Sequence, residues 1–253
     1  MMHANEQSAK AQAFLALHKS DDLLILPNIW NPIGAKALET NGYPAIATAS
    51  AAIAESLGYE DGENIKLKTL LEILLRISKS VKVPVTADIE SGYADTIDDL
   101  KEAILAVIDT GVVGINIEDS LRNSEPLRSV TEQCDRISAI REISATRGLH
   151  LVINARVDSF ISGDFQSDHE RIEDAIMRAN LYTEAGADCI YPIGPGDSET
   201  LTVLREQISS PLNVLASPNA LSLTDLHSLG INRVSFGPFI FRSCLSKFVN
   251  ITN

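Results

Sequence analysis

Short runs of apolar and β-branched residues recur along the chain, each bounded by Gly, Pro or Asn, and polar or amphipathic stretches separate them. Runs of this kind predict β-strands. Eight strands are predicted, at residues 23–28, 45–50, 84–90, 113–119, 150–158, 189–194, 212–217 and 233–238. Eight is the number of parallel strands that closes a barrel.

The segments between the predicted strands have the spacing of amphipathic helices. Apolar residues recur every three or four positions, as in 67–77 and 100–108. Several of these helices end at a glycine that can form a left-handed cap: Gly42, Gly111, Gly186 and Gly230. The repeated alternation of strand and helix predicts an α/β fold, a (β/α)8 TIM barrel, with residues 1–253 in a single domain.

Two segments have predicted roles outside this repeat. The polar stretch at residues 1–20 is expected to form an N-terminal helical segment that closes the bottom of the barrel. Residues 120–129 form the longest irregular connection near the acidic strand ends, so they are the candidate active-site lid loop.

The composition bears on partners and compartment. The chain is 45% hydrophobic with a net charge of −13, and its basic residues are scattered, which argues against nucleic acid as a partner. The N-terminus has no signal-peptide pattern, and no apolar stretch approaches the ~18 residues that a membrane span requires. We therefore expect a cytoplasmic protein with no membrane contact. Three separated cysteines predict reduced thiols, with Cys189 in the core.

Acidic residues stand at the ends of two neighbouring predicted strands. Asp88 and Glu90 end one strand, and Glu118 and Asp119 end the next. In a parallel barrel these ends share one rim, which is where α/β folds place their chemistry. Several carboxylates at one rim cannot all ionise without a compensating cation. We therefore predict Mg²⁺, with Mn²⁺ as an alternative, bound directly by Asp88 and supported by Glu90 and Glu118.

Several of these polar residues also have a structural interpretation. Asp119, Asp158 and Ser217 could equally cap helices or form salt bridges. Capping explains Asp88 less well, because Asp88 lies within an apolar strand. Arg156 is suited to bind a carboxylate or a developing oxyanion, and its alternative role is an ion pair with a neighbouring acid. The histidines fall away from this rim, so none is expected to act as a catalytic base.

Four motifs lie in a fixed order along the chain: TASAAIAESLGYED at 48–61, ADIESGY at 87–93, GINIED at 114–119 and NARVD at 154–158. Together they resemble the isocitrate lyase and phosphoenolpyruvate mutase superfamily, over most of the chain. The resemblance implies a barrel that binds Mg²⁺ and a small 2-oxo acid or phosphonate. It also implies that the metal stabilises the enolate of a pyruvate-like fragment.

The resemblance further implies a role for individual residues. The implied metal residues are Asp88, Glu90, Glu118 and Asp61. Among them Asp88 matches the direct ligand, Glu90 stands where the family usually has Asp, and the other two match residues that reach the metal through water. Arg156 matches the arginine that binds the reacting group. Ser50 and Ala51 match the turn whose backbone amides hold the substrate carboxylate.

One loop departs from the family pattern. Family lyases carry Lys-Arg-Cys-Gly-His after the fourth strand, whereas residues 121–126 read Leu-Arg-Asn-Ser-Glu-Pro, without Cys, Lys or His. Loss of that proton-transfer group argues against cleavage of isocitrate or methylisocitrate. Mutase-like members carry Lys-x-Asn-Ser, which Arg122, Asn123 and Ser124 match imperfectly. In a reaction at a C–P bond, Arg122 and Asn123 would contact the phosphonyl group, and Ser124 is a further candidate for substrate binding.

These observations predict a Mg²⁺-dependent lyase that cleaves a C–C bond in a small 2-oxo or 2-hydroxy carboxylate through a metal-stabilised enolate, as decarboxylases, retro-aldol and retro-Claisen enzymes do. The candidate catalytic residues are Arg156, Glu118, Arg122 and Asn123. Two alternatives stay open: a C–P mutase or hydrolase acting on a phosphonopyruvate-like compound, and a barrel that binds metal or ligand without catalysis. A homo-oligomer, dimer or tetramer, is expected. Exchange of a C-terminal helix is not, because about fifteen residues after the last strand provide one helix only.

Overall fold

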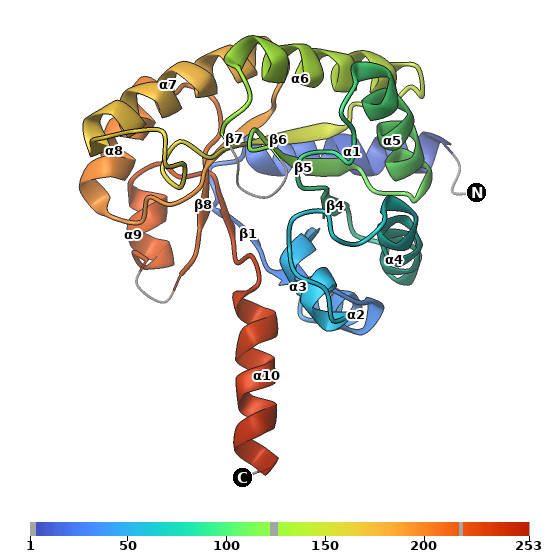
Figure 1. The fold of residues 1–253 in the computed structure, drawn as a ribbon. Helices are drawn as coiled ribbons and strands as arrows, with labels where there is room; N and C mark the ends of the chain where they lie inside the picture. Colours follow the sequence, from blue (N-terminus) through green and yellow to red (C-terminus); the bar gives the residue numbers. More distant parts are fainter. Residues whose placement is uncertain (1–3, 122–125, 218–219, 253) are drawn as a thin grey trace.

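Parallel strands surrounded by helices form this α/β protein, shown as a computed structural model in Figure 1. The structure describes residues 4–121, 126–217 and 220–252. The strands are β1 (Leu24–Leu26), β2 (Asn28–Ile29), β3 (Ile46–Thr48), β4 (Val85–Asp88), β5 (Gly114–Glu118), β6 (Val152–Val157), β7 (Cys189–Pro192), β8 (Asn213–Leu215) and β9 (Arg233–Ser235).

The strands close into the barrel that the sequence predicts. Strands β2 to β7 pair in chain order, and β8, β9 and β1 form a second parallel set. The two sets meet where β1 continues into β2 across Pro27, and where an isolated parallel bridge joins Ile190 to Leu212. Because β1 and β2 occupy one position in the barrel, the described strands fill the eight predicted positions, and the predicted fold class is confirmed.

The strands are shorter than the apolar runs, and this corrects several predicted boundaries. Pro27 lacks an N–H group and interrupts the first run. The second run stops at Thr48, and Ser50, predicted at a strand end, instead begins a helix. Glu90 lies past the end of β4 with a positive φ of 52°. The polar residues that follow the strands therefore belong to turns and helix starts.

The helices are α1 (Ala4–His18), α2 (Pro32–Thr40), α3 (Ser50–Ser56), α4 (Leu67–Ser80), α5 (Ile97–Asp109), α6 (Val130–Ala145), α7 (Asp168–Glu184), α8 (Ser198–Gln207), α9 (Leu223–Ser228) and α10 (Phe239–Thr252). Several begin at a side chain that accepts a hydrogen bond from the first turn, as Asn31 and Thr96 do. The glycines predicted as caps all have the expected positive φ, including Gly111 at 95° and Gly186 at 116°.

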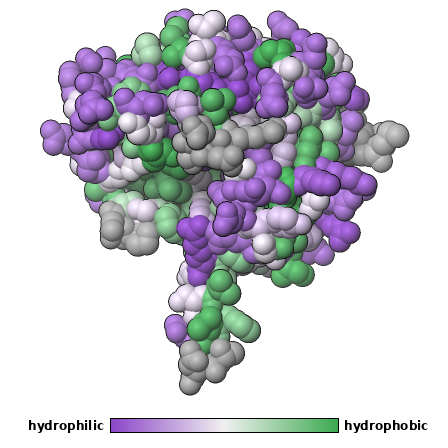
Figure 2. Space-filling model, in the orientation of Figure 1, coloured by the Kyte–Doolittle hydropathy of each residue, from purple (hydrophilic) through white to green (hydrophobic). Residues whose placement is uncertain are grey.

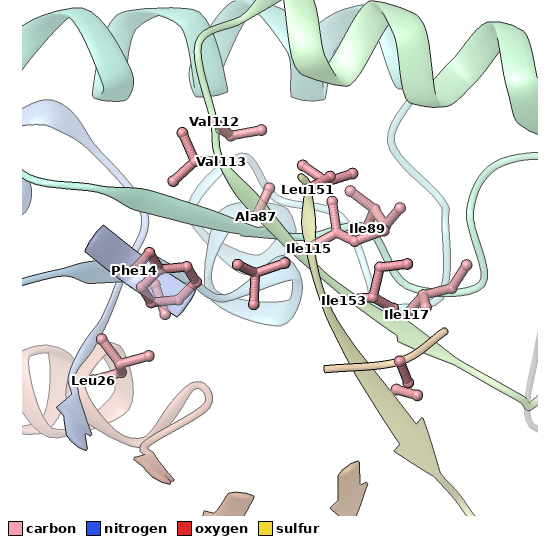
Figure 3. Packing of buried hydrophobic residues seen from close by; sticks show 14 of the residues in the cluster. Phe14, Leu26, Ala87, Ile89, Val112, Val113, Ile115, Ile117, Leu151 and Ile153 are labelled. Atoms are coloured by element: carbon pink, nitrogen blue, oxygen red, sulfur yellow. The ribbon is translucent and has the colours of Figure 1, made fainter. Parts of the chain in front are cut away.

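Alternation along the strands separates the core from the barrel interior. In β5, Ile115 and Ile117 are fully buried and belong to the hydrophobic core shown in Figure 3. The intervening Asn116 points to the opposite face, where it contacts polar side chains of β4 and β6. Thus the two isoleucines of β5 belong to the hydrophobic core, and Asn116 between them faces the barrel interior.

Helix α1 occupies the segment expected to close the bottom of the barrel. Phe14 on this helix is fully buried and reaches the start of β5, where a Cβ on Gly114 would lie 2.8 Å from its ring. His18 at the helix end is also fully buried. Cys189 is buried, as predicted for a core thiol.

Helix α10 projects from the barrel (Figure 1). Its first turn is anchored by a 2.5 Å salt bridge between Arg242 and Glu55 and by an edge-to-face contact between Phe241 and Trp30. Further along, Leu245 and Ile251 are 51% and 85% exposed, and hydrophobic side chains are visible on this helix in Figure 2. Within the described ranges, no helix combines the length and apolar character that a bilayer crossing requires.

Candidate active site

Asp88, at the end of β4, is held in one orientation by its neighbours. Its Oδ2 accepts hydrogen bonds from the Ser50 amide at 3.2 Å and the Ser50 hydroxyl at 2.8 Å. Its Oδ1 accepts from the Asn116 amide group at 3.0 Å. Asn116 is the register partner of Asp88 on β5, and Ser50 is the first residue of α3. Two neighbouring elements therefore fix this carboxylate.

Arg156, on β6, lies between two carboxylates. Its Nη1 donates to Glu118 at 2.6 Å, and its Nε and Nη2 donate to Asp158 at 2.6 and 3.0 Å. Burial would lower the pKa of Arg156, but the two carboxylates raise it well above its usual value. Arg156 is therefore charged, and two of the five N–H groups of its guanidinium are not used in these bonds.

The acids around Asp88 carry more negative charge than the arginine compensates. Burial raises the pKa of Glu118 well above its usual range despite the opposing charge of Arg156. Burial, followed by the charges of Asp88 and Asp61, raises the pKa of Glu90 to about 7. The pKa of Asp61, at the rim, is raised by loss of hydration and by Asp88. Burial is the largest cause of each of these raised pKa values, and a cation placed near the carboxyl groups would favour their ionised forms.

Strained backbone surrounds Glu90. Glu90, Tyr93 and Glu63 are the described non-glycine residues with positive φ, at 52°, 57° and 58°. The Tyr93 hydroxyl donates to Glu90 at 3.1 Å, and the Glu63 amide donates to the other Glu90 oxygen. The Glu63 carboxylate in turn accepts from the Ser91 hydroxyl at 2.7 Å. Such conformations cost of order 1–3 kcal/mol each and are concentrated at functional sites.

Two adjoining cavities, of about 200 and 190 Å³, lie at this end of the barrel. Both are lined by Ser50, Asp61 and Arg156. The cavities together are lined by the predicted residues Ser50, Ala51, Asp61, Asp88, Glu90, Glu118 and Arg156. The predicted residues Arg122, Asn123 and Ser124, and with them the middle of the candidate lid, lie outside the described residues.

The donor chemistry of the site fits a hard divalent cation. In the described part of the chain, no group of three or more His, Cys, Asp or Glu side chains is arranged so that it alone could hold a metal ion. Mg²⁺ does not need one, because it commonly takes one or two carboxylates and completes its shell with water and substrate oxygens. Asp88 already accepts from Ser50, whose hydroxyl can rotate away without backbone movement. A cation here would also supply the missing positive charge.

Asp119 forms a buried salt bridge, which was one of the roles considered for it from the sequence. It is fully buried and accepts hydrogen bonds from Arg178 at 3.1 Å and from the Tyr182 hydroxyl at 2.7 Å. Its other oxygen accepts from the Asp158 backbone amide at 2.9 Å. Asp158 itself pairs with Arg156. Asp158 therefore fixes Arg156, and Asp119 holds the Asp158 backbone in place.

Some residues of the site were not identified from the sequence. Asn116 contacts Asp88, yet only its position two residues before Glu118, on the same face of β5, could have indicated that it faces the interior. Glu63 organises the turn around Glu90, and no local pattern marks it. Asn213 and Arg233 line the deeper part of the first cavity. Their alternation with Val214 and Val234 was the available signal, but it does not reveal what they face.

The chain is similar to several known proteins. It is 31% identical to the uncharacterized protein Rv1998c of Mycobacterium tuberculosis H37Rv, over 89% of this chain and 81% of that protein. It is 27% identical to 2-methylisocitrate lyase of Halalkalibacterium halodurans, over 88% and 72% of the two chains. A crystal structure of a candidate phosphonomutase from Burkholderia cenocepacia J2315 superimposes with a TM-score of 0.92 and 30% identity, covering 97% and 98%.

The family comparison agrees with the four motifs. The model of the family described as phosphoenolpyruvate phosphomutase matches residues 14–253, which includes every described residue of the two cavities. The superfamily to which it belongs includes lyases and mutases. The chain therefore belongs to the phosphoenolpyruvate phosphomutase family, within the isocitrate lyase and phosphoenolpyruvate mutase superfamily.

Proposed function

We propose that this chain is a Mg²⁺-dependent lyase that cleaves a C–C bond in a small 2-oxo or 2-hydroxy carboxylate. The main support is that Asp88 and Arg156 line one cavity, and each is fixed by other side chains. Asp88 can bind a cation and Arg156 can bind an anion, and both side chains are oriented before substrate arrives. This arrangement suits a reaction in which negative charge develops on a substrate oxygen.

Arg156 and the start of α3 provide the groups for the substrate. The two free N–H groups of Arg156 would bind a charged substrate oxygen, because three others are held by Glu118 and Asp158. Ser50 and Ala51 line the same cavity and would hold the substrate carboxylate. Ser50 also orients Asp88, so one residue links the position of the substrate to that of the Asp88 carboxylate.

Mg²⁺ would be held directly by Asp88, with Glu90, Glu118 and Asp61 in contact through water. When bound, it supplies the positive charge that stabilises the enolate oxygen left after bond cleavage. The raised pKa values of Glu90, Glu118 and Asp61 support this assignment, because a nearby cation favours their ionised forms. The same residues would accept Mn²⁺, which also prefers oxygen ligands.

Decarboxylation of a 3-carboxylated 2-oxo acid is the C–C cleavage that fits this chain best. The bond to the departing carboxyl group breaks, CO₂ leaves, and the electron pair stays on the substrate as an enolate that takes a proton from solvent. This reaction needs no acid from the loop, and residues 121–126 contain no Cys, Lys or His. The 2-methylisocitrate lyase relative supports C–C chemistry in general.

Reaction at a C–P bond is the second candidate. It is supported by the similarity to the candidate phosphonomutase of B. cenocepacia, which extends over 97% of the chain. A screen of oxaloacetate, methylisocitrate-type acids and phosphonopyruvate with Mg²⁺ separates the two. Pyruvate formed from oxaloacetate supports the lyase, and inorganic phosphate or phosphoenolpyruvate from phosphonopyruvate supports the alternative. Absence of turnover on all three, with metal bound, would favour a barrel that binds ligands without catalysis.

The metal assignment is tested by calorimetric titration of Mg²⁺. Asp88→Asn keeps the size of the side chain and removes its charge, so we expect the Mg²⁺ binding heat to disappear and turnover to fall by at least about 100-fold. Asp109→Asn is the matched control, because this acid pairs with Arg147 on the exposed surface, far along α5 from the strand ends. Equal heats in wild type and Asp88→Asn would exclude Asp88 as the metal ligand.

We also infer that the chain assembles into a homo-oligomer. The exposed apolar residues of α10, including Leu245 and Ile251, lie on a helix that projects from its own barrel. Ile33 and Leu57, outside α10, are also exposed, at 75% and 44%. Exposed apolar residues outside α10 would allow each copy to cover the helix of another.

A further inference from the structure

Arg233 is a buried arginine at the deep end of the first cavity. It is the first residue of β9 and therefore lies toward the N-terminal end of the strands, whereas Asp88 ends β4 at the opposite rim. Its side chain is 2% exposed and lines the same cavity as Asp88 and Arg156. The cavity thus extends from the acidic rim to a cationic floor.

Within the described residues, no carboxylate forms an ion pair with Arg233. Its side chain hydrogen-bonds His18, whose Nε2 lies 3.3 Å from the Arg233 Nη1. Burial lowers the pKa of His18 to about 4, so the imidazole is neutral, and its Nδ1 bonds the Phe14 carbonyl oxygen at 2.8 Å. His18 therefore offers a lone pair to the arginine without offering negative charge.

Two polar atoms at this floor lack partners among the described residues. The Nε of Arg233 is buried without an acceptor, and the Oδ1 of Asn213 is buried without a donor. Asn213 is the register partner of Arg233 on β8, and both residues line the cavity. A buried donor and acceptor on neighbouring strands are costly unless a ligand or water pairs with them.

The two arginines Arg156 and Arg233, which line the first cavity, differ in whether carboxylates pair with them. Arg156 is paired with both Glu118 and Asp158, so most of its charge is already balanced. Arg233 has no carboxylate partner in the described structure, and its charge is therefore available to an anion that enters the cavity. A retained buried charge of this kind lowers stability unless a ligand compensates it.

We propose that Arg233, with Asn213 beside it, forms an anion subsite at the floor of the cavity that binds the distal carboxylate of the substrate. The inference rests on the proposed function only in taking the substrate to be a small carboxylate held at the rim by Asp88 and Arg156. It adds where the second acid group of such a substrate lies: directed down the barrel axis, toward Arg233. Asn213 would pair with that group or with a hydroxyl next to it.

Binding of diacids compared with their monoamides tests the proposal without turnover. Malonate, succinate and glutarate, each against its monoamide, would be titrated into the Mg²⁺-loaded protein, because the amide keeps the shape and removes one charge. We expect at least one diacid to bind about 10- to 100-fold more tightly than its amide in wild type. In Arg233→Met this ratio should fall to near one. An unchanged ratio in the variant, or no preference for any diacid in wild type, would overturn the proposal.

A stability measurement separates ligand binding from a structural role. Removing an unpaired buried charge should leave the melting temperature of ligand-free Arg233→Met equal to or above that of wild type. A merely structural arginine would give a clearly lower value. Arg205→Met is the matched control, because Arg205 binds the Ile208 carbonyl outside the cavities, and its diacid preference should equal that of wild type. Arg233→Lys keeps the charge without Nε and should retain part of the preference.

Two further outcomes are distinguishable. In the first, formate binds in the presence of saturating oxalate and its binding depends on Arg233, while the ratio of diacid to monoamide affinity does not. A separate small anion then occupies the floor, and the proposal that Arg233 binds the substrate is wrong. If diacid binding depends on Arg233 but no C–C cleavage occurs, the floor subsite stands and the proposed function fails. Cleavage with the same KM in wild type and Arg233→Met would support the proposed function and exclude the floor subsite.

Discussion

At the scale of single residues, each functional side chain of the site is oriented by a second one. Asn116 holds Asp88, Asp158 holds Arg156, and Tyr93 holds Glu90. Supporting contacts of this kind fix a reactive geometry before substrate arrives. The acids and Arg156 could be identified from the sequence, because their chemistry is unusual within apolar runs. Their partners could not, because an asparagine or tyrosine acquires its role only through the register of neighbouring strands.

Arg233 illustrates the same limit more strongly. An arginine at the start of a strand looks like an ordinary surface residue in the sequence, since the N-terminal ends of barrel strands usually contribute to stability. Only the closed barrel shows that its side chain is buried and shares a cavity with Asp88. Long side chains can thus join the two ends of a barrel in a way that the order of residues does not indicate.

The buried neutral His18 predicts a specific loss of stability in acid. Its pKa is about 4 in the folded chain and about 6.5 when unfolded, so the unfolded chain binds the proton first as the pH falls. The stability from neutral His18 is complete above pH 6.5 and is lost as the pH falls toward 4. We expect the free energy of unfolding of wild type, relative to His18→Gln, to drop by about 2 to 3 kcal/mol between pH 7.5 and 4.5.

Urea unfolding of both proteins across this pH range measures the difference. Glu90 and Asp119 have raised pKa values, about 7 and about 6, and so contribute stability in the opposite direction as the pH falls. Their contribution is common to wild type and His18→Gln, and it cancels in the comparison. A difference that stays constant with pH would mean that His18 is not buried in its neutral form.

At the scale of elements, the alternation of strand and helix was predictable, but the junctions between them were not. Apolar runs identify strands because burial on both faces removes polar residues. The run at 45–50 continues beyond β3, because Ala49 and Ser50 are as buried at the start of α3 as they would be in a strand. Burial alone therefore cannot separate the last strand residue from the first helix residue. At this site the distinction matters, because the Ser50 amide contacts Asp88.

The contact between α1 and β5 gives a prediction for the closed end of the barrel. A Cβ on Gly114 would lie 2.8 Å from the Phe14 ring, 2.9 Å from the Thr86 hydroxyl and 3.1 Å from the Val152 carbonyl oxygen. Gly114→Ala should therefore lower the free energy of unfolding by about 1–3 kcal/mol through overpacking. Adding Phe14→Leu, which removes the aromatic ring, should recover part of the loss.

Gly163→Ala is the matched control for this pair. Nothing lies within 4 Å of a Cβ at Gly163, so the same addition of a methyl group should change stability by no more than about 0.5 kcal/mol. Denaturant titrations of the three variants provide the comparison. If Gly114→Ala were as stable as wild type, the close approach of α1 to the start of β5 would be wrong.

At the scale of the whole molecule, the length of the C-terminal segment was predictable and its direction was not. One helix follows the last strand, as expected, but it projects from the barrel instead of covering it. A helix of 14 residues extends about 20 Å, which is long enough to reach a neighbouring subunit. The sequence-based expectation that this helix is not exchanged stays a prediction, which the state of assembly in solution tests.

The assembly prediction follows from the apolar residues of this helix. Wild type should have a mass in solution that is a multiple of 27.4 kDa, measured by size-exclusion chromatography with light scattering. Leu245→Asp combined with Ile251→Asp places charges on the exposed apolar positions of α10 and should shift the protein toward the monomer. Ser246→Asp adds a charge on the same helix at an exposed polar position and should leave the mass unchanged. A monomeric wild type, or an assembly insensitive to the double variant, would show that α10 is not the element that joins the subunits.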